Sequence, residues 1–209
     1  GHINDYYRTG YGTSGDDIGP THTNDSLADF MGTSQDAYGN SNGATTFFFY
    51  TDGSRMSGAN IEAYGSSYYN RSGMYGIYEY AAYAGYSIDL DSIYNQYTDN
   101  YSHPNYSEYG QFTFDDYMAE IDAGRVVMIH VEGHSMFGYG YDAGTSEIIL
   151  HDTWNAGEKR MDWGGSYSGM ELYGITAFEM AAVPVPGTMG LLSFGLISLV
   201  SLKRRSNQR

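Results

Sequence analysis

The sequence predicts an α+β fold in which an antiparallel sheet packs against helices. A helix signature over residues 113–123 is followed at once by an apolar run of strand length at residues 125–131. Further strand-like segments, joined by short polar turns, follow as far as residue 180. Strands joined by short turns pair in antiparallel fashion, so we expect these segments to form one sheet.

Composition limits the classes of protein that fit. With 209 residues and 41% apolar content, the chain is long enough to bury one sizeable core. The formal charge is −15, and the body before residue 203 is more acidic still, at −19. Such a surface repels phosphate backbones, which argues against nucleic acid as a partner. Cysteine is absent, which excludes disulfides, thiolate metal sites and a cysteine nucleophile within these residues.

Two elements are expected early in the chain. Asn24 or Asp25 is a suitable N-cap for a short helix that Gly32 ends. Residues 45–50 are β-branched and aromatic, which favours a strand, and Asp52-Gly53 supplies a turn after it.

The middle of the chain predicts a second helix and a loop. Residues 73–84 fit a helix whose small side chains permit close packing, although its glycines cost it roughly 1 kcal/mol each relative to alanine. Residues 95–110 are polar and contain Pro104, which indicates a surface excursion.

The clearest local signal surrounds Thr113. Acidic residues occupy the first turn after this N-cap, and the helix should run to Ala123, where Gly124 caps it. Residues 125–131 are then almost continuously apolar, so we expect a central strand buried on both faces.

A hairpin over residues 133–154 carries the candidate chemistry. His134 opens its first strand and Asp152 closes its second, so antiparallel pairing brings an imidazole beside a carboxylate. That pair is the base and the orienting group of a nucleophilic triad. Residues 159–165 and 172–180 are expected to add further strands to the sheet.

The histidines also allow other interpretations. A strand histidine such as His134 is often a hydrogen-bonded core residue, and His151 should point to the face opposite Asp152 in a structural role. A zinc site built from His130, His134 and His151 is an alternative. The glutamate at 132 is not in the zincin position, however, and the segment is strand and turn rather than helix. We therefore predict no metal and no cofactor.

The character of the sequence changes at residue 183. Residues 183–186 alternate valine and proline, residues 187–202 form an uncharged and largely apolar segment, and residues 203–209 form a basic end. We therefore expect two units, a domain over residues 1–182 and a tail over residues 183–209 whose hydrophobic helix would be short for a membrane span. The alternative is an ordinary single-pass anchor at this end of the chain.

This tail resembles the PEP-CTERM sorting signal of exopolysaccharide-producing Gram-negative bacteria. The resemblance implies export, transient insertion of the C-terminal helix in the inner membrane, and processing by an exosortase partner. The protein would then reach the cell surface or the extracellular matrix. Val185 stands where the family usually has glutamate, which is a departure from its pattern.

The hairpin resembles the papain-like cysteine peptidases, and most closely the C39-like branch. The resemblance rests on Gly133-His134 and on Asp152-Thr153-Trp154, and residues 24–35 also resemble C39-like proteins that carry this sorting tail. It implies an incomplete papain-like fold for residues 1–182, with His134 as general base, Asp152 as the residue that orients it and Trp154 as a shield over their hydrogen bond. The implied reaction is thiol-mediated cleavage of a peptide or protein substrate.

The family's nucleophile, a cysteine at the start of an early helix, has no counterpart in this chain. The chain begins Gly-His-Ile-Asn without an initiator methionine, and we interpret it as a fragment or processed chain that lacks the cysteine helix. These residues alone should be inactive. The alternative is a non-catalytic surface or exopolysaccharide-matrix binding protein on the same fold.

Overall fold

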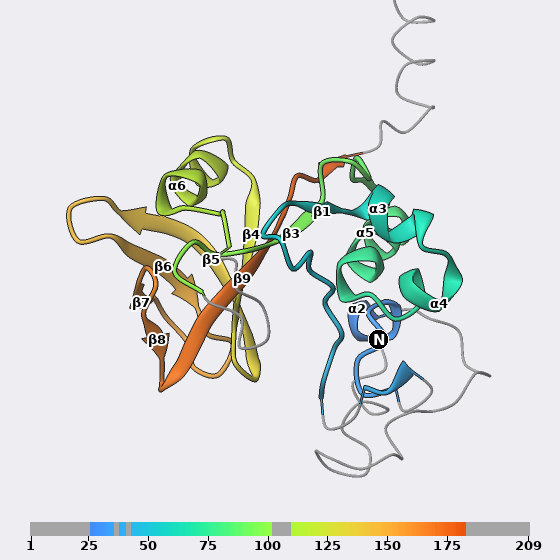
Figure 1. Ribbon diagram of the computed structural model, residues 1–209, viewed down its shortest axis with the longest axis horizontal. Helices are drawn as coiled ribbons and strands as arrows, with labels where there is room; N and C mark the ends of the chain where they lie inside the picture. The colour runs from blue at the N-terminus through green and yellow to red at the C-terminus, as the bar shows by residue number, and fades with distance from the viewer. Residues whose placement is uncertain (1–25, 36–37, 41–42, 102–109, 183–209) are drawn as a thin grey trace, which may run out of the picture.

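The structure is a computed structural model that describes residues 26–35, 38–40, 43–101 and 110–182. It is α+β, and every strand pairing in its sheets is antiparallel (Figure 1). Four helices lie together on one side of the molecule, and a fifth, α6, lies beside the sheet (Figure 1). The helices are α2 Leu27–Phe30, α3 Gly58–Ala63, α4 Ser66–Tyr69, α5 Gly73–Tyr83 and α6 Phe114–Asp122.

The main sheet has the strand order β1-β3-β9-β4-β5-β6-β7, and β8 pairs with β9 off this path. A separate two-stranded sheet pairs β10 with β2. The strands are β1 Met56–Ser57, β2 Tyr86–Ser87, β3 Tyr94–Tyr97, β4 Val126–Val131, β5 His134–Asp142, β6 Glu147–His151, β7 Lys159–Asp162, β8 Ser166–Tyr167, β9 Met170–Phe178 and β10 Ala181–Ala182.

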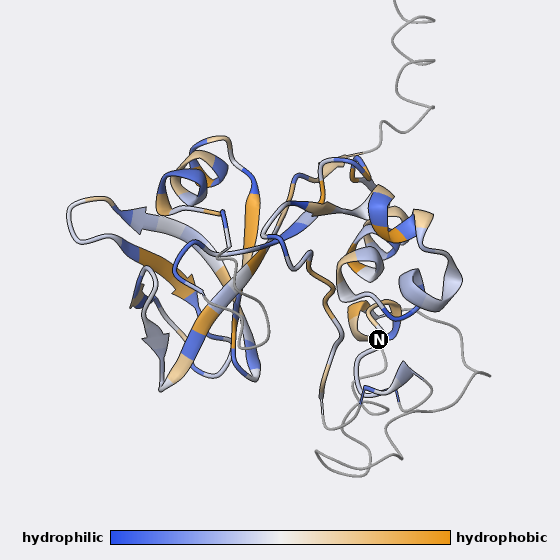
Figure 2. Cartoon of the chain, in the orientation of Figure 1, coloured by the Kyte–Doolittle hydropathy of each residue, from blue (hydrophilic) through white to orange (hydrophobic). Residues whose placement is uncertain are grey.

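The two faces of the sheet belong to two hydrophobic clusters. One cluster joins Phe112 and Tyr117 to side chains of β4, β5, β6 and β9. The other joins α3 and α5 to Phe178 and to the partly buried Val126 and Met128 of β4. Apolar residues accordingly concentrate along β4 and β9, between the two groups of elements (Figure 2). The expectation of a central strand at residues 125–131 is confirmed, because β4 lies between β9 and β5.

The helix predicted after Thr113 is confirmed with its cap. Thr113 Oγ1 accepts from the N–H of Asp116, and the Asp116 carboxylate accepts from the N–H of Thr113. This capping box satisfies two N–H groups that an uncapped helix leaves without partners, and a cap of this kind is worth about 1 kcal/mol. Gly124 follows the helix with φ +75°, a conformation that favours glycine.

The other two helices were predicted with different accuracy. The helix expected at residues 73–84 is present as α5. The N-terminal helix is present as α2, but its N-cap is Ser26 rather than Asn24 or Asp25, which lie outside the described residues. Ser26 and Asp29 form a capping box, a pairing that the sequence prediction overlooked.

Two predictions about strands were wrong. Residues 45–50 are extended but form no strand, only a single bridge between Thr46 and Ser72. Residues 94–97, assigned mostly to a loop, form strand β3 next to β9. Their polar character was misleading because Asn95 and Gln96 are buried and hydrogen-bonded to main-chain oxygens of Phe48 and Gly53.

A buried polar chain connects the sheet to the extended segment at residues 43–50. Ser135 Oγ lies 2.9 Å from His130 Nδ1, and Thr176 Oγ1 lies 2.8 Å from His130 Nε2. Thr176 donates to Asn95 Oδ1 at 2.5 Å, and Asn95 donates to the main-chain oxygen of Phe48 at 2.9 Å. The donor direction along this chain fixes the His130 tautomer, with the proton on Nε2 and the lone pair on Nδ1.

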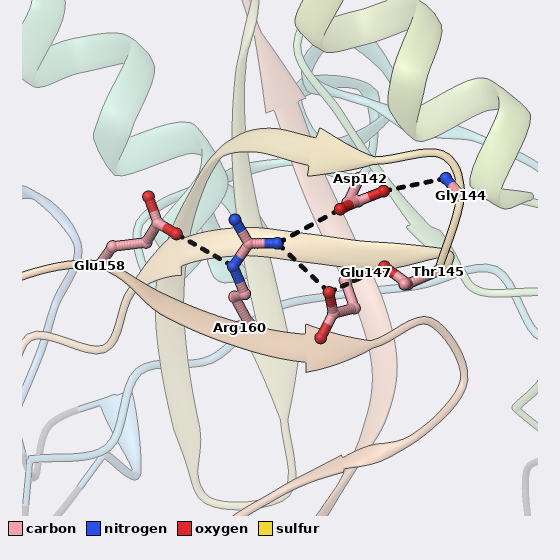
Figure 3. A network of polar contacts seen from close by, with 6 residues as sticks. All are labelled: Asp142, Gly144, Thr145, Glu147, Glu158 and Arg160. Atoms are coloured by element: carbon pink, nitrogen blue, oxygen red, sulfur yellow. Dashed lines mark hydrogen bonds and ion pairs between the residues drawn. The ribbon is translucent and has the colours of Figure 1, made fainter.

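The predicted hairpin and the strand after it form the meander β5-β6-β7. On its outer surface, Arg160 of β7 bonds to three carboxylates, those of Asp142, Glu147 and Glu158 (Figure 3). The guanidinium is partly exposed, so solvent screens these ion pairs; those to Asp142 and Glu147 link β7 to β5 and β6 and add little stability.

The predicted tail at residues 183–209, including its hydrophobic helix, lies outside the described residues. Among the helices that are described, none has the length and apolar character required to cross a membrane.

Candidate functional site

The β4–β5 hairpin presents His134 at the first position of β5. His134 pairs with Val131 across a two-residue turn, and Gly133 adopts φ +82° in that turn. A Cβ on Gly133 would meet nothing within 4 Å. The glycine is therefore explained by its left-handed backbone conformation.

The imidazole of His134 is oriented by a main-chain oxygen. Its Nε2 lies 2.7 Å from the carbonyl oxygen of Asp152, just after the end of β6. A carbonyl can only accept, so Nε2 carries a proton, and in the neutral ring the lone pair is then on Nδ1. Within the described part of the chain, no group is bonded to Nδ1. The ring therefore has the form that a general base requires, with its basic nitrogen available.

The Asp152 carboxylate does not orient the imidazole, which corrects one part of the predicted triad geometry. Its Oδ1 accepts from the N–H groups of Trp154 and Asn155 at 3.1 and 3.0 Å, and its Oδ2 accepts from the Tyr167 hydroxyl at 2.8 Å. The hairpin thus brings His134 and Asp152 together as expected, but through the main chain of the aspartate.

These bonds hold a strained turn. Thr153 has φ +63°, which is costly for a β-branched residue, on the order of 1–2 kcal/mol. The Asp152 carboxylate spans that residue by binding the N–H groups that follow it. The carboxylate therefore offsets the strain of a turn that directs the Asp152 carbonyl at His134.

The same contacts keep the Asp152 carboxyl ionised. Hydrogen bonds from the Asn155 N–H, the Tyr167 hydroxyl and the Trp154 N–H lower its pKa to about 2, against the opposing effect of burial, and Lys159 adds a favourable charge. The pKa of Tyr167 is raised to about 12, by burial first and then by the neighbouring carboxylate. Tyr167 therefore remains a neutral donor at neutral pH.

Trp154 covers one face of the imidazole. Its ring is stacked on His134, with centroids 4.1 Å apart and an interplanar angle of 20°. It remains 53% exposed, so it limits water on one side of the His134 ring while its other face meets solvent. The predicted position of Trp154 beside the pair agrees with this geometry.

The remaining histidines occupy separate environments. His130 is fully buried in the polar chain described above, and His151 is exposed and stacked on Tyr139 with centroids 4.6 Å apart. Within the residues that the structure describes, no three His, Asp or Glu side chains are grouped so that they could hold a metal ion.

Tyr167 is the site residue that the sequence did not reveal. It lies in β8, whose two residues pair with β9, and its hydroxyl reaches Asp152 from 15 residues away. The chain contains 23 tyrosines, so nothing in composition or spacing singles this one out. Comparison with known proteins adds no assignment, since no family model, curated protein or solved structure matches the chain.

Proposed function

We propose that this chain supplies the histidine half of a papain-like, C39-like cysteine peptidase site on an exported protein. His134 would act as the general base, taking a proton from a thiol that attacks a peptide carbonyl. The observation that carries the proposal is the hydrogen bond from Nε2–H to the Asp152 carbonyl, because it places the lone pair of the neutral imidazole on Nδ1.

The acceptor of this bond is chemically suited to the role. An amide oxygen is neutral, so it fixes the tautomer and the ring orientation without neutralising the imidazolium that forms when the base takes a proton. Trp154 supports the same role, because a stacked indole favours a cationic ring through its π face. The thiol must come from outside these residues, since the chain has no cysteine.

The test is the activity of the natural gene product that contains this chain together with any sequence before Gly1. We expect hydrolysis of a peptide library that a cysteine-directed alkylating reagent blocks and that His134→Gln lowers by at least 100-fold. The 209-residue chain alone is the matched negative control. Hydrolysis by this chain that is sensitive to the same reagent, or a longer product without a cysteine, would overturn the proposal.

A second candidate is a non-catalytic protein that binds polysaccharide on the same fold. It is favoured by aromatic rings that remain exposed on β5: Phe137 and Tyr139 are 39% and 37% exposed, and Tyr139 stacks on His151. Flat exposed rings of this kind can pack against the apolar faces of sugars.

This candidate predicts retention of the 209-residue chain on an immobilised exopolysaccharide, and weaker retention of Tyr139→Ala. Tyr83→Ala is the control, because Tyr83 is an exposed tyrosine on α5. Equal retention of both variants and the unmodified chain would remove the support that the β5 aromatics give to this function.

The proposed location is the cell surface or extracellular matrix, reached through processing of residues 183–209 by an exosortase. This part of the proposal rests on the sequence of the tail alone. The expected result is membrane retention of the uncleaved protein in an exosortase-deficient host and its release when the enzyme is present.

A further inference from the structure

We infer that Tyr167 is a positioning residue for His134, and that Asp152 acts on the imidazole through its main-chain oxygen while its carboxylate serves the turn. The inference rests on the proposed role of His134 as a base. It adds Tyr167 to the site and changes the role of the aspartate from direct acceptor to turn-forming residue.

Three hydrogen bonds fix the Asp152 carboxylate. Both of its oxygens are occupied, Oδ1 by two main-chain N–H groups and Oδ2 by the Tyr167 hydroxyl. Asp152 is only 2% exposed, and a rotation of its carboxylate toward His134 would break three hydrogen bonds at once. The carboxylate is therefore held where it is.

The position of the carboxylate determines the direction of the carbonyl. The carboxylate and the carbonyl both belong to Asp152. The strained Thr153 lies between this residue and the two N–H groups that the carboxylate binds. Releasing the carboxylate lets Thr153 relax to an ordinary backbone conformation, which rotates the peptide plane that presents the carbonyl. Nε2–H of His134 would then lose its acceptor.

Tyr167 contacts the carboxylate from another element of the fold. The two N–H donors are local to the turn, whereas Tyr167 belongs to β8, which pairs with β9. Its hydroxyl thus ties the turn after β6 to a neighbouring strand pair, and its ring also contacts Trp154, with centroids 6.2 Å apart. Loss of the hydroxyl alone should loosen the turn while the ring contact remains.

The test is imidazole ¹⁵N NMR of the 209-residue protein, with the His134 signals assigned by comparison with His134→Gln. At a pH high enough for the imidazole to be neutral, we expect the unmodified protein to show a single tautomer, with hydrogen on Nε2 and none on Nδ1. In Tyr167→Phe these signals should shift toward an average of the two tautomers. Tyr139→Phe, which removes a tyrosine hydroxyl from β5, should leave them unchanged.

Asp152 variants separate the two roles of that residue. Asp152→Asn keeps an oxygen for the turn N–H groups, and its amide can donate to the Tyr167 oxygen, so the Nε2–H form should persist. Asp152→Ala removes the turn contacts and should abolish the preference. Amide spectra of each variant check that it folds, and the comparison of Asp152→Asn with Tyr167→Phe decides the matter even if Asp152→Ala does not fold.

Two outcomes would overturn the inference. If Tyr167→Phe leaves the His134 signals as in the unmodified protein, Tyr167 has no positioning role. If Asp152→Asn shifts the signals further than Tyr167→Phe does, the carboxylate itself orients the ring. Neither outcome depends on hydrolysis, so the proposed peptidase function can fail in the activity assay while the positioning role stands.

Discussion

At the scale of single residues, the surroundings of two histidines on neighbouring strands, His130 and His134, decide which of the two can exchange a proton. Both have a hydrogen bond from Nε2 to an oxygen, but Nδ1 of His130 accepts from Ser135, whereas Nδ1 of His134 has no partner among the described residues. His130 is packed among the aromatic rings of Phe47, Phe49 and Tyr173, and its two ring nitrogens bond to neutral hydroxyl groups. Only His134 is therefore arranged to exchange a proton.

Burial lowers the pKa of His130 to about 3 from 6.5, and this sets a pH window for stability. As pH falls below 6.5, the unfolded chain binds a proton at this residue that the native protein does not bind. Stability should therefore decline between pH 6.5 and about 3, with a contribution of up to ~1.4 kcal/mol per pH unit. Below that window both states are protonated, and the contribution no longer changes.

Urea unfolding at a series of pH values from 7 to 5 measures this contribution. His130→Gln should show a shallower loss of unfolding free energy with acidification than the unmodified protein, whatever its absolute stability. His151→Gln is the control, because His151 is exposed and should leave the slope as it is. Equal slopes for His130→Gln and the unmodified protein would contradict the prediction.

At the scale of elements, a glycine in β9 makes room for an aromatic ring from outside the sheet. Gly174 lies between Tyr97 and His130 in the register of β3, β9 and β4. The Phe49 ring lies over it, stacked on Tyr97 at 4.5 Å, and a Cβ on Gly174 would come within 2.7 Å of that ring. The missing side chain therefore lets the segment at residues 43–50 pack on the sheet.

Gly174→Ala should consequently destabilise the protein by about 1–3 kcal/mol, because Phe49 must move. Gly140→Ala is a matched control in β5, where the nearest atom to the added Cβ lies at 3.4 Å, an ordinary contact. Its effect should be under about 1 kcal/mol. Free energies of unfolding in urea compare the two, and an equal loss would show that the Phe49 contact is not the cause.

At the scale of the whole molecule, the hydrogen-bond chain from Ser135 to Phe48 joins the sheet to the segment that leads into the helices. Asn95 is its last side chain and is fully buried. Asn95→Ala leaves the hydrogen of the Thr176 hydroxyl without an acceptor and the Phe48 carbonyl without its Asn95 donor, which should cost about 2–3 kcal/mol. The loss of stability should be greatest on the helical side of the molecule, which this hydrogen-bond chain connects to the sheet.

Hydrogen exchange followed by mass spectrometry tests where that loss is located. Amides of α5 and of residues 43–50 should exchange faster in Asn95→Ala, with a smaller change in β5, β6 and β7. Gln111→Ala serves as the control, because it removes an exposed hydrogen bond from the Gln111 side-chain amide to the Asp52 main-chain carbonyl. A uniform increase in exchange across all strands would show that the two sides unfold as one unit.

The sequence by itself determined the elements whose signals are local. The helix that Thr113 caps, the apolar run of β4 and the turn-separated strands of the hairpin depend on residues close together in the chain, and the structure has them as predicted. The adjacency of His134 and Asp152 follows from the same hairpin. These features could be predicted because periodicity and capping act over a few residues.

Only the tertiary structure decided which atoms of these residues meet. Strand β3 was not predicted because its polar side chains bond to groups far away in the sequence. Asn95, for example, donates to the main-chain oxygen of Phe48. The role of Asp152 changed because Tyr167, from a different strand pair, and a strained Thr153 direct its carbonyl rather than its carboxylate at His134. Such contacts depend on how strands pack together, and sequence spacing does not encode the direction in which a side chain turns.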